Sequence, residues 1–87
     1  MVDDLTKKFA YAFDRVILKA RKSLSPYAVY RRTAVEPRDS AAHRAGKRSM
    51  RLGMFMLMVH THGLTFEEMM EVWREHPDFE ARWRYEK

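Results

Sequence analysis

The stretch HTHGLTFEEM, residues 60–69, combines the signals that end one helix and start the next. Gly63 stands where a residue in the left-handed conformation ends a helix, because glycine adopts a positive φ without a steric penalty. Thr65 and Glu68 then form a capping box, in which each side chain accepts a hydrogen bond from the other residue's backbone amide. The stretch therefore predicts two helices joined at Gly63.

Apolar residues with helical spacing continue this pattern toward the N-terminus. Leu5, Phe9, Phe13 and Val16 recur at intervals of three and four, which predicts an amphipathic helix over residues 3–22.

A second start signal follows that helix. Ser25 is a capping residue and Pro26 suits the first helical position, so PYAVYRR, residues 26–32, is expected to form one or two helical turns. Residues 33–40 are expected to form a loop, because the residue before Pro37 is disfavoured in a helical conformation.

One long central helix is expected over residues 40–61, with two different halves. Basic residues at spacings of three and four make a stripe on one face of the first half; they are Arg44, Lys47, Arg48 and Arg51. The second half, LGMFMLMV at 52–59, is apolar on all sides and belongs either to the core or to an interface. Small residues on a third face, Gly46 among them, would let another backbone approach closely.

The helix after the capping box separates apolar from acidic residues. The apolar residues expected to face the core are Phe66, Met69, Met70 and Trp73. The glutamates expected on the opposite face, solvated or available for ion pairs, are Glu67, Glu68, Glu71 and Glu75.

Pro77 is expected to end that helix, and residues 78–86 to form a last one with Phe79 and Trp83 facing inward. No segment alternates as a strand does. The sequence therefore predicts an all-α fold, a single domain over residues 1–87 with four to five helices around a core rich in Phe, Met and Trp.

Composition excludes several classes of protein. There is no cysteine, so disulfides and thiolate chemistry are excluded. The longest apolar run, residues 54–59, is far shorter than the roughly 20 residues of a membrane span. The acidic start MVDDLTKK has no apolar signal core. These features predict a soluble, cytoplasmic protein with no membrane partner.

Two histidines, His60 and His62, invite the interpretation of a metal site. On a helix, residues two apart point roughly 200° away from each other, and no recognised ligand spacing is present. The sequence also lacks a glycine-rich phosphate loop and a nucleophile with a nearby base. We therefore expect no metal, no cofactor, no catalytic residue and no enzymatic activity.

The charge distribution favours an anionic partner. Residues 1–51 carry thirteen basic and five acidic side chains, a net charge of +8, whereas residues 52–87 carry four and seven, a net charge of −3. The basic stripe would follow a phosphate backbone. The further basic residues that could extend it are Lys19, Arg21, Lys22, Arg31 and Arg32. Tyr27 and Tyr30 would stack on bases if they are exposed.

A resemblance supports this interpretation. GLTFEEMMEVWREHPDFEARW, residues 63–83, resembles helix-turn-helix segments of sigma-factor DNA-binding domains and of the small terminase subunits of tailed phages. The terminase-like alignment makes the glutamate-rich helix after Thr65 the DNA reader. The sigma-like alignment gives that role to the last helix, with Arg82, Arg84 and Lys87. The resemblance implies a phage or mobile-element origin.

The sequence therefore predicts a small basic protein that works by binding, with nucleic acid as the first candidate partner. The alternative is a protein-binding adaptor, assembly factor or inhibitor, because aromatic, Met and Arg residues are enriched at the centres of interfaces. A homo-oligomer is compatible with either function.

Overall fold

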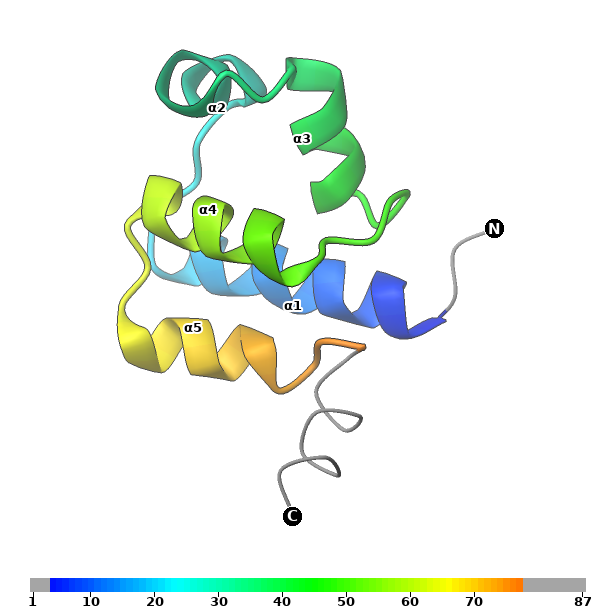
Figure 1. The fold of residues 1–87 in the computed structure, drawn as a ribbon. Coiled ribbons are helices and arrows are strands. Elements are labelled where there is room, and N and C mark those ends of the chain that lie inside the picture. The colour runs from blue at the N-terminus through cyan, green and yellow to red at the C-terminus, as the bar shows by residue number, and fades with distance from the viewer. Residues whose placement is uncertain (1–3, 78–87) are drawn as a thin grey trace.

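Five helices make up the part of the chain that the computed structural model describes, residues 4–77 (Figure 1). They are α1 (Asp4–Lys19), α2 (Pro26–Thr33), α3 (Pro37–Arg44), α4 (Leu52–His62) and α5 (Phe66–Trp73). No strand occurs within these residues, which confirms the predicted all-α fold. The helix expected over residues 78–86 lies outside the described residues.

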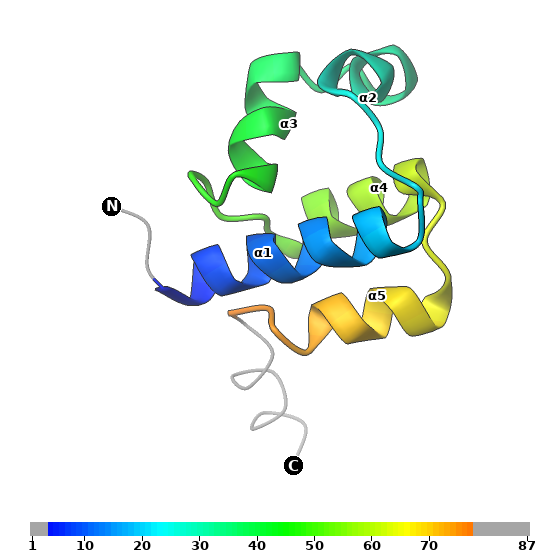
Figure 2. The ribbon, with the colours of Figure 1, turned by 180° about the vertical axis from the view of Figure 1, so that it is seen from behind.

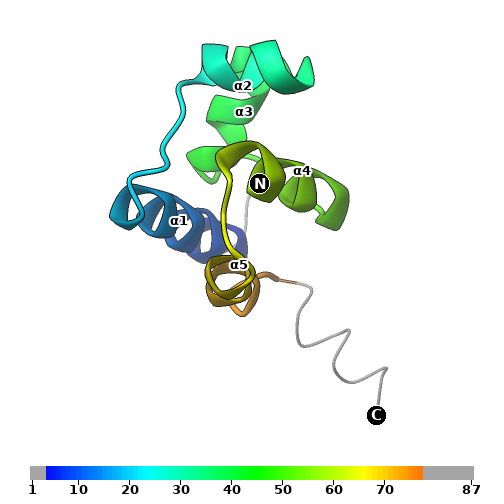
Figure 3. The same ribbon diagram turned by 90° about the vertical axis from the view of Figure 1, so that its left-hand side faces the viewer.

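The helices form two groups. α1 and α4 lie between α5 on one side and the α2–α3 pair on the other (Figures 1, 2 and 3). α2 and α3 pack on each other at the opposite end from α5, with α3 contacting α1 and α2 contacting α4. A view turned by 90° shows the same separation between the α2–α3 pair and α5 (Figure 3).

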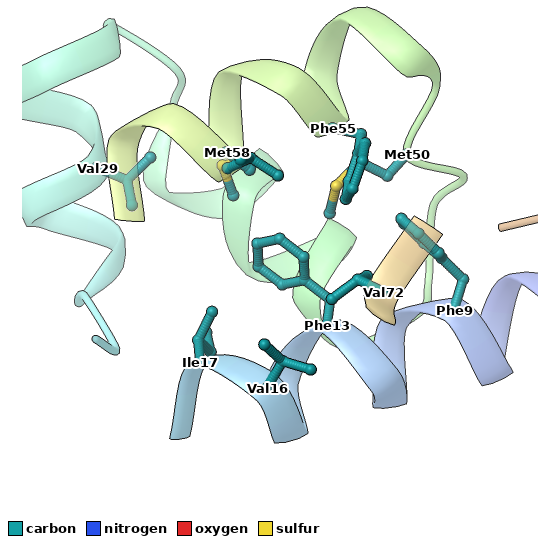
Figure 4. Close-up of a cluster of buried hydrophobic side chains, with 10 residues drawn as sticks. Phe9, Phe13, Val16, Ile17, Val29, Met50, Phe55, Met58 and Val72 are labelled. Carbon is teal, nitrogen blue, oxygen red and sulfur yellow. The ribbon is translucent and has the colours of Figure 1, made fainter. Parts of the chain in front are cut away.

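The core lies where α1 meets the other helices (Figure 4). Phe9 and Phe13 of α1 meet Phe55 of α4 edge to face, with ring centroids 5.3 and 6.4 Å from Phe55. Edge-to-face contacts suit the charge distribution of aromatic rings. The other buried apolar residues of this cluster are Val16, Ile17, Val29, Met50, Met58, Val59 and Val72.

α1 confirms the predicted amphipathic helix but ends earlier than residue 22. Arg21 adopts a positive φ of 57°, and the amide of Lys22 donates to the carbonyl of Ile17 at 2.9 Å. This bond closes the helix in the manner of a Schellman motif. Leu5, which was expected on the apolar face, is 52% exposed because it lies beyond the core at the open end of the helix.

The prediction of one long helix over residues 40–61 is wrong. α3 begins at Pro37, inside the expected loop, and ends at Arg44, while α4 begins only at Leu52. Gly46 interrupts the helix with a φ of +73°, and a Cβ there would lie 3.3 Å from both Ala10 Cβ and Lys7 Cα of α1.

The reason for the break is tertiary packing. A straight helix of 22 residues would be about 33 Å long, whereas α3 packs on α1 and α2, and α4 packs on α2, as two short helices. The connector between α3 and α4 changes the direction of the chain, and Met50 within it is buried at 3% exposure (Figure 1). The close approach expected of Gly46 does occur, but from this connector and not from a helix face.

The joint at Gly63 is confirmed. Gly63 has a φ of 68°, and the amide of Leu64 donates to the carbonyl of Val59 at 3.0 Å. The capping box is complete, since the Glu68 amide donates to Thr65 Oγ1 at 3.2 Å and the Thr65 amide donates to Glu68 Oε1 at 2.8 Å.

The apolar face predicted for α5 is only partly correct. Val72 is fully buried, while Met69 and Trp73 pack against the core as half-buried residues. Phe66 is 71% exposed, although it was expected to face inward. α5 is thus rotated about its axis relative to the prediction, so that Val72 faces the core and Phe66 faces outward.

None of the helices formed by residues 4–77 is long and apolar enough to cross a membrane.

Candidate nucleic-acid interface

The predicted basic stripe does not lie on one helix face. Arg44 is in α3, whereas Lys47, Arg48 and Arg51 lie in the connector between α3 and α4. Because this connector is not helical, spacings of three and four no longer place these side chains in a line.

Arg44 is a structural residue. Its side chain is only 19% exposed and forms an ion pair with Asp14 of α1. The same guanidinium donates to the carbonyl oxygen of Leu24 at 3.0 Å, in the segment between α1 and α2. Arg44 therefore holds α3 against the first part of the chain and has little surface left for a ligand.

The other basic residues predicted to contact phosphate differ in whether they already bind a partner within the protein. Arg48 pairs with Asp39 at 3.0 Å, but both side chains are exposed, so the pair is weak and a ligand could displace it. Arg32 donates to the carbonyl oxygen of Thr61 at 3.2 Å. Arg31, Lys47 and Arg51 are exposed, and they form no ion pair within the described part of the chain.

Two of the three glutamates of α5, and Glu75 just after it, form ion pairs with basic residues of α1 or of the turn after it. The pairs are Glu75–Lys8 at 2.9 Å, Glu71–Arg15 at 3.9 Å and Glu68–Lys22 at 2.7 Å. From the sequence, the four glutamates could be either solvated or ion-paired. In the structure, Glu68, Glu71 and Glu75 are ion-paired. The pKa of Glu68 is lowered, first by its hydrogen bond from Lys22 and then by the Thr65 amide.

The net charge of the described residues is unevenly distributed. Residues 25–51, which contain α2, α3 and the connector, carry seven basic and two acidic side chains, a net charge of +5. The remaining described residues, 4–24 and 52–77, carry seven basic and six acidic ones, a net charge of +1. We call the exposed part of residues 25–51 the α2–α3 surface.

Two tyrosines add aromatic area to the α2–α3 surface. Tyr27 is 69% and Tyr30 43% exposed. With Arg31 they occupy positions i, i+3 and i+4 of α2, which share one side of a helix. Val29, which is buried at 1% exposure, lies on the other side and anchors α2 to the core. Both tyrosines are therefore exposed, as stacking on bases would require.

One basic residue of this surface was missed. Arg38 is exposed at the start of α3. The sequence predicts a loop over residues 33–40, because the residue before Pro37 is disfavoured in a helical conformation. Proline is equally suited to the first position of a helix, and that property was the signal that would have placed Arg38 on α3.

The histidines have structural roles. Nδ1 of His62 donates to the carbonyl oxygen of Met58 at 2.8 Å, and Nε2 of His76 donates to that of Met50 at 2.6 Å. His60 is exposed. Residues 4–77 contain no group of three or more His, Cys, Asp or Glu side chains placed to hold a metal ion.

A small cavity of about 130 Å³ lies between α1, the connector and the end of the described chain. Its described lining residues are Thr6, Phe9, Ser49, Met50, Arg51, His76 and Pro77. No carboxylate is among them, and His76 is already bonded to the Met50 carbonyl, so these residues do not form an acid–base pair.

Searches of protein-family models, curated proteins and solved structures found no match to this chain. The helix-turn-helix resemblance of residues 63–83 therefore stays a prediction. In the fold, α5 lies on the far side of α1 from the α2–α3 surface (Figure 1). Arg82, Arg84 and Lys87 of the sigma-like alignment lie outside the described residues.

Proposed function

We propose that this protein is a small, non-enzymatic nucleic-acid-binding protein whose α2–α3 surface contacts the phosphate backbone. The observation that carries the proposal is the separation of charge in the fold. Of the net charge of +6 carried by residues 4–77, +5 lies in residues 25–51. Outside that range, Lys8, Arg15 and Lys22 are already paired with Glu75, Glu71 and Glu68.

The contacts we assign to phosphates are the exposed basic residues of this surface: Arg31, Arg38, Lys47, Arg48 and Arg51. Such contacts release condensed counterions from the nucleic acid and give affinity that does not depend on sequence. Arg44 acts indirectly, since it holds α3 in place through Asp14 and Leu24.

This assignment departs from both helix-turn-helix alignments. The exposed part of α5 includes Phe66, Glu67 and Arg74, a surface with no net positive charge. Compared with this surface, the α2–α3 surface is complementary to phosphate, because its net charge is positive.

The test is the salt dependence of binding, measured by fluorescence anisotropy with labelled oligonucleotides between 50 and 300 mM salt. Each phosphate contact contributes roughly 0.7–0.9 to the slope of log K against log salt concentration. We expect Arg31→Glu with Lys47→Glu to weaken binding and to lower the slope by about 1.5.

The matched control is Arg21→Glu with Arg74→Glu, which makes the same change in net charge at exposed residues outside the α2–α3 surface. We expect it to retain most of the affinity. Equal losses in the two double variants would show that only net charge matters, and affinity that does not change with salt would contradict the proposal altogether.

The second candidate function is binding of a protein partner, and the specific observation in its favour is Phe66. A phenylalanine with 71% of its surface exposed, beside Met70 on α5, is a residue type enriched at interface centres. A nuclease-treated pull-down that recovers one dominant protein with the natural chain, and loses it with Phe66→Ser, would favour this function over nucleic-acid binding.

A further inference from the structure

We propose that the exposed side of α2, formed by Tyr27, Tyr30 and Arg31, is a stacking platform for the bases of single-stranded nucleic acid. This inference rests on the proposed function and specifies its ligand. The predicted ligand is a strand whose bases are unpaired, and not a duplex that is recognised only through its phosphates.

The first argument is the availability of the two rings. Tyr27 is 69% and Tyr30 43% exposed. Neither ring takes part in any of the ring–ring contacts found among residues 4–77, which all involve Phe, Trp or His. Both tyrosines therefore have exposed surface that no other ring of the described residues occupies.

The second argument is the spacing of the rings. Residues three apart on a helix have Cβ atoms about 5–6 Å from each other, so the two rings project from neighbouring points on one side of α2. Arg31, one residue further, lies on the same side. Its guanidinium is positioned to meet a phosphate beside the stacked bases, or to stack on a base itself.

The third argument is that α2 is rigidly held although it has only eight residues. Ser25 Oγ accepts a hydrogen bond from the Ala28 amide at 3.2 Å, which caps the start of the helix. At the end, Ala34 adopts a φ of 62° and its amide donates to the Tyr30 carbonyl at 2.8 Å. Arg32 ties the helix to α4 through the Thr61 carbonyl.

These features discriminate between single and double strands. In a duplex the faces of the bases are covered by their neighbours, so an aromatic side chain on a helix cannot reach them without unstacking. In a single strand every base offers a face, and stacking tolerates any sequence. A preorganised pair of rings beside a phosphate-binding charge is therefore best used by unpaired bases.

The experiment measures anisotropy at low salt with the intact chain and four labelled probes: twelve-nucleotide oligo(dT), twelve-nucleotide oligo(U), a twelve-base-pair DNA duplex and a twelve-base-pair RNA duplex. We expect the single strands to bind more tightly than the duplex of the same sugar. Comparing oligo(dT) with oligo(U) distinguishes a DNA ligand from an RNA ligand.

The variants isolate stacking from charge. We expect Tyr27→Ala and Tyr30→Ala each to weaken single-strand binding about tenfold. Tyr27→Phe and Tyr30→Phe should bind within about twofold of the natural chain, because the ring is kept. Tyr11→Ala is the matched control, since Tyr11 is 70% exposed but lies on α1. Circular dichroism checks that every variant remains folded.

The outcomes separate this inference from the proposed function. If the duplexes bind as tightly as the single strands, or if the alanine variants bind normally while Arg31→Glu with Lys47→Glu loses affinity, stacking is wrong and phosphate binding stands. If none of the four probes binds the natural chain, the proposed function fails and the stacking platform fails with it.

Discussion

At the scale of single residues, His62 is a buried histidine whose environment disfavours the protonated ring. It is buried at 4% exposure, and its Nε2 has no hydrogen-bond partner. The ring of Phe13 packs against it with centroids 5.6 Å apart, and two cations, Arg44 and Arg32, act on it from α3 and α2. Burial is the largest cause that lowers the pKa of His62, ahead of these two arginines, while the bond to the Met58 carbonyl raises it.

The sign of the resulting pH dependence follows from linkage. A folded-state pKa below the ordinary value of 6.5 means that the unfolded chain binds protons more readily. The pKa of His43 is lowered as well, again chiefly by burial. The contribution of both groups to stability is therefore complete above about pH 6.5 and is lost as the pH falls below that value.

We predict that the free energy of unfolding, measured by urea denaturation from pH 8 to pH 5, stays level above about pH 6.5 and declines below it. His62→Asn keeps an amide donor near the position of Nδ1 but does not titrate. This variant should be less stable at pH 8, because it loses the ring contact with Phe13, and its decline toward pH 5 should be shallower. Identical declines in the two proteins would contradict the role of His62.

At the scale of helices, the break between α3 and α4 depends on long-range packing more than on local propensity. Gly46 satisfies two demands at once, a positive φ and close contact with α1. Gly53, within α4, meets neither demand, since a Cβ there would have nothing within 4 Å. Glycine is thus required at the first position and is merely tolerated at the second.

We predict opposite effects for the two alanine substitutions, measured by thermal or urea unfolding. Gly46→Ala should destabilise the fold by about 1–2 kcal/mol or more, because of the left-handed backbone and the contacts with Ala10 and Lys7. Gly53→Ala should stabilise it by about 0.5 kcal/mol, because alanine favours the helix. Stabilisation by both changes would instead indicate a continuous helix over residues 40–61.

At the scale of the whole molecule, the α2–α3 pair is attached to the other helices partly by charged and polar contacts. Val29 provides the apolar anchor. Arg44 bridges α3 to Asp14 and to the Leu24 carbonyl, and Arg32 bridges α2 to α4. The basic residues of α2, α3 and the connector therefore have two roles. Some attach these elements to the rest of the protein, and others are exposed to solvent.

This division predicts different consequences for two arginines. Arg44→Met should lower the free energy of unfolding by about 1–2 kcal/mol, since it removes an ion pair to a half-exposed carboxylate and a hydrogen bond from a charged donor. Arg31→Met should change stability by less than about 0.5 kcal/mol, because Arg31 is exposed. Urea unfolding of both variants checks this, and equal stabilities would contradict the structural role of Arg44.

Local signals in the sequence were sufficient to predict where several helices begin or end. Ser25 with Pro26, Gly63, and the capping box of Thr65 and Glu68 all act within a few residues of the chain, so their hydrogen bonds do not depend on the rest of the fold. Helical periodicity likewise predicted that Phe9, Phe13 and Val16 of α1 face the core.

Contacts between distant residues decided the remaining features. Gly46 adopts a left-handed conformation in contact with α1, where the periodic pattern predicts a continuous helix. Phe66 is exposed, although the same kind of pattern places it toward the core. A periodic pattern shows which residues share a helix face, but the partner that such a face meets is chosen by packing and charge across the whole chain.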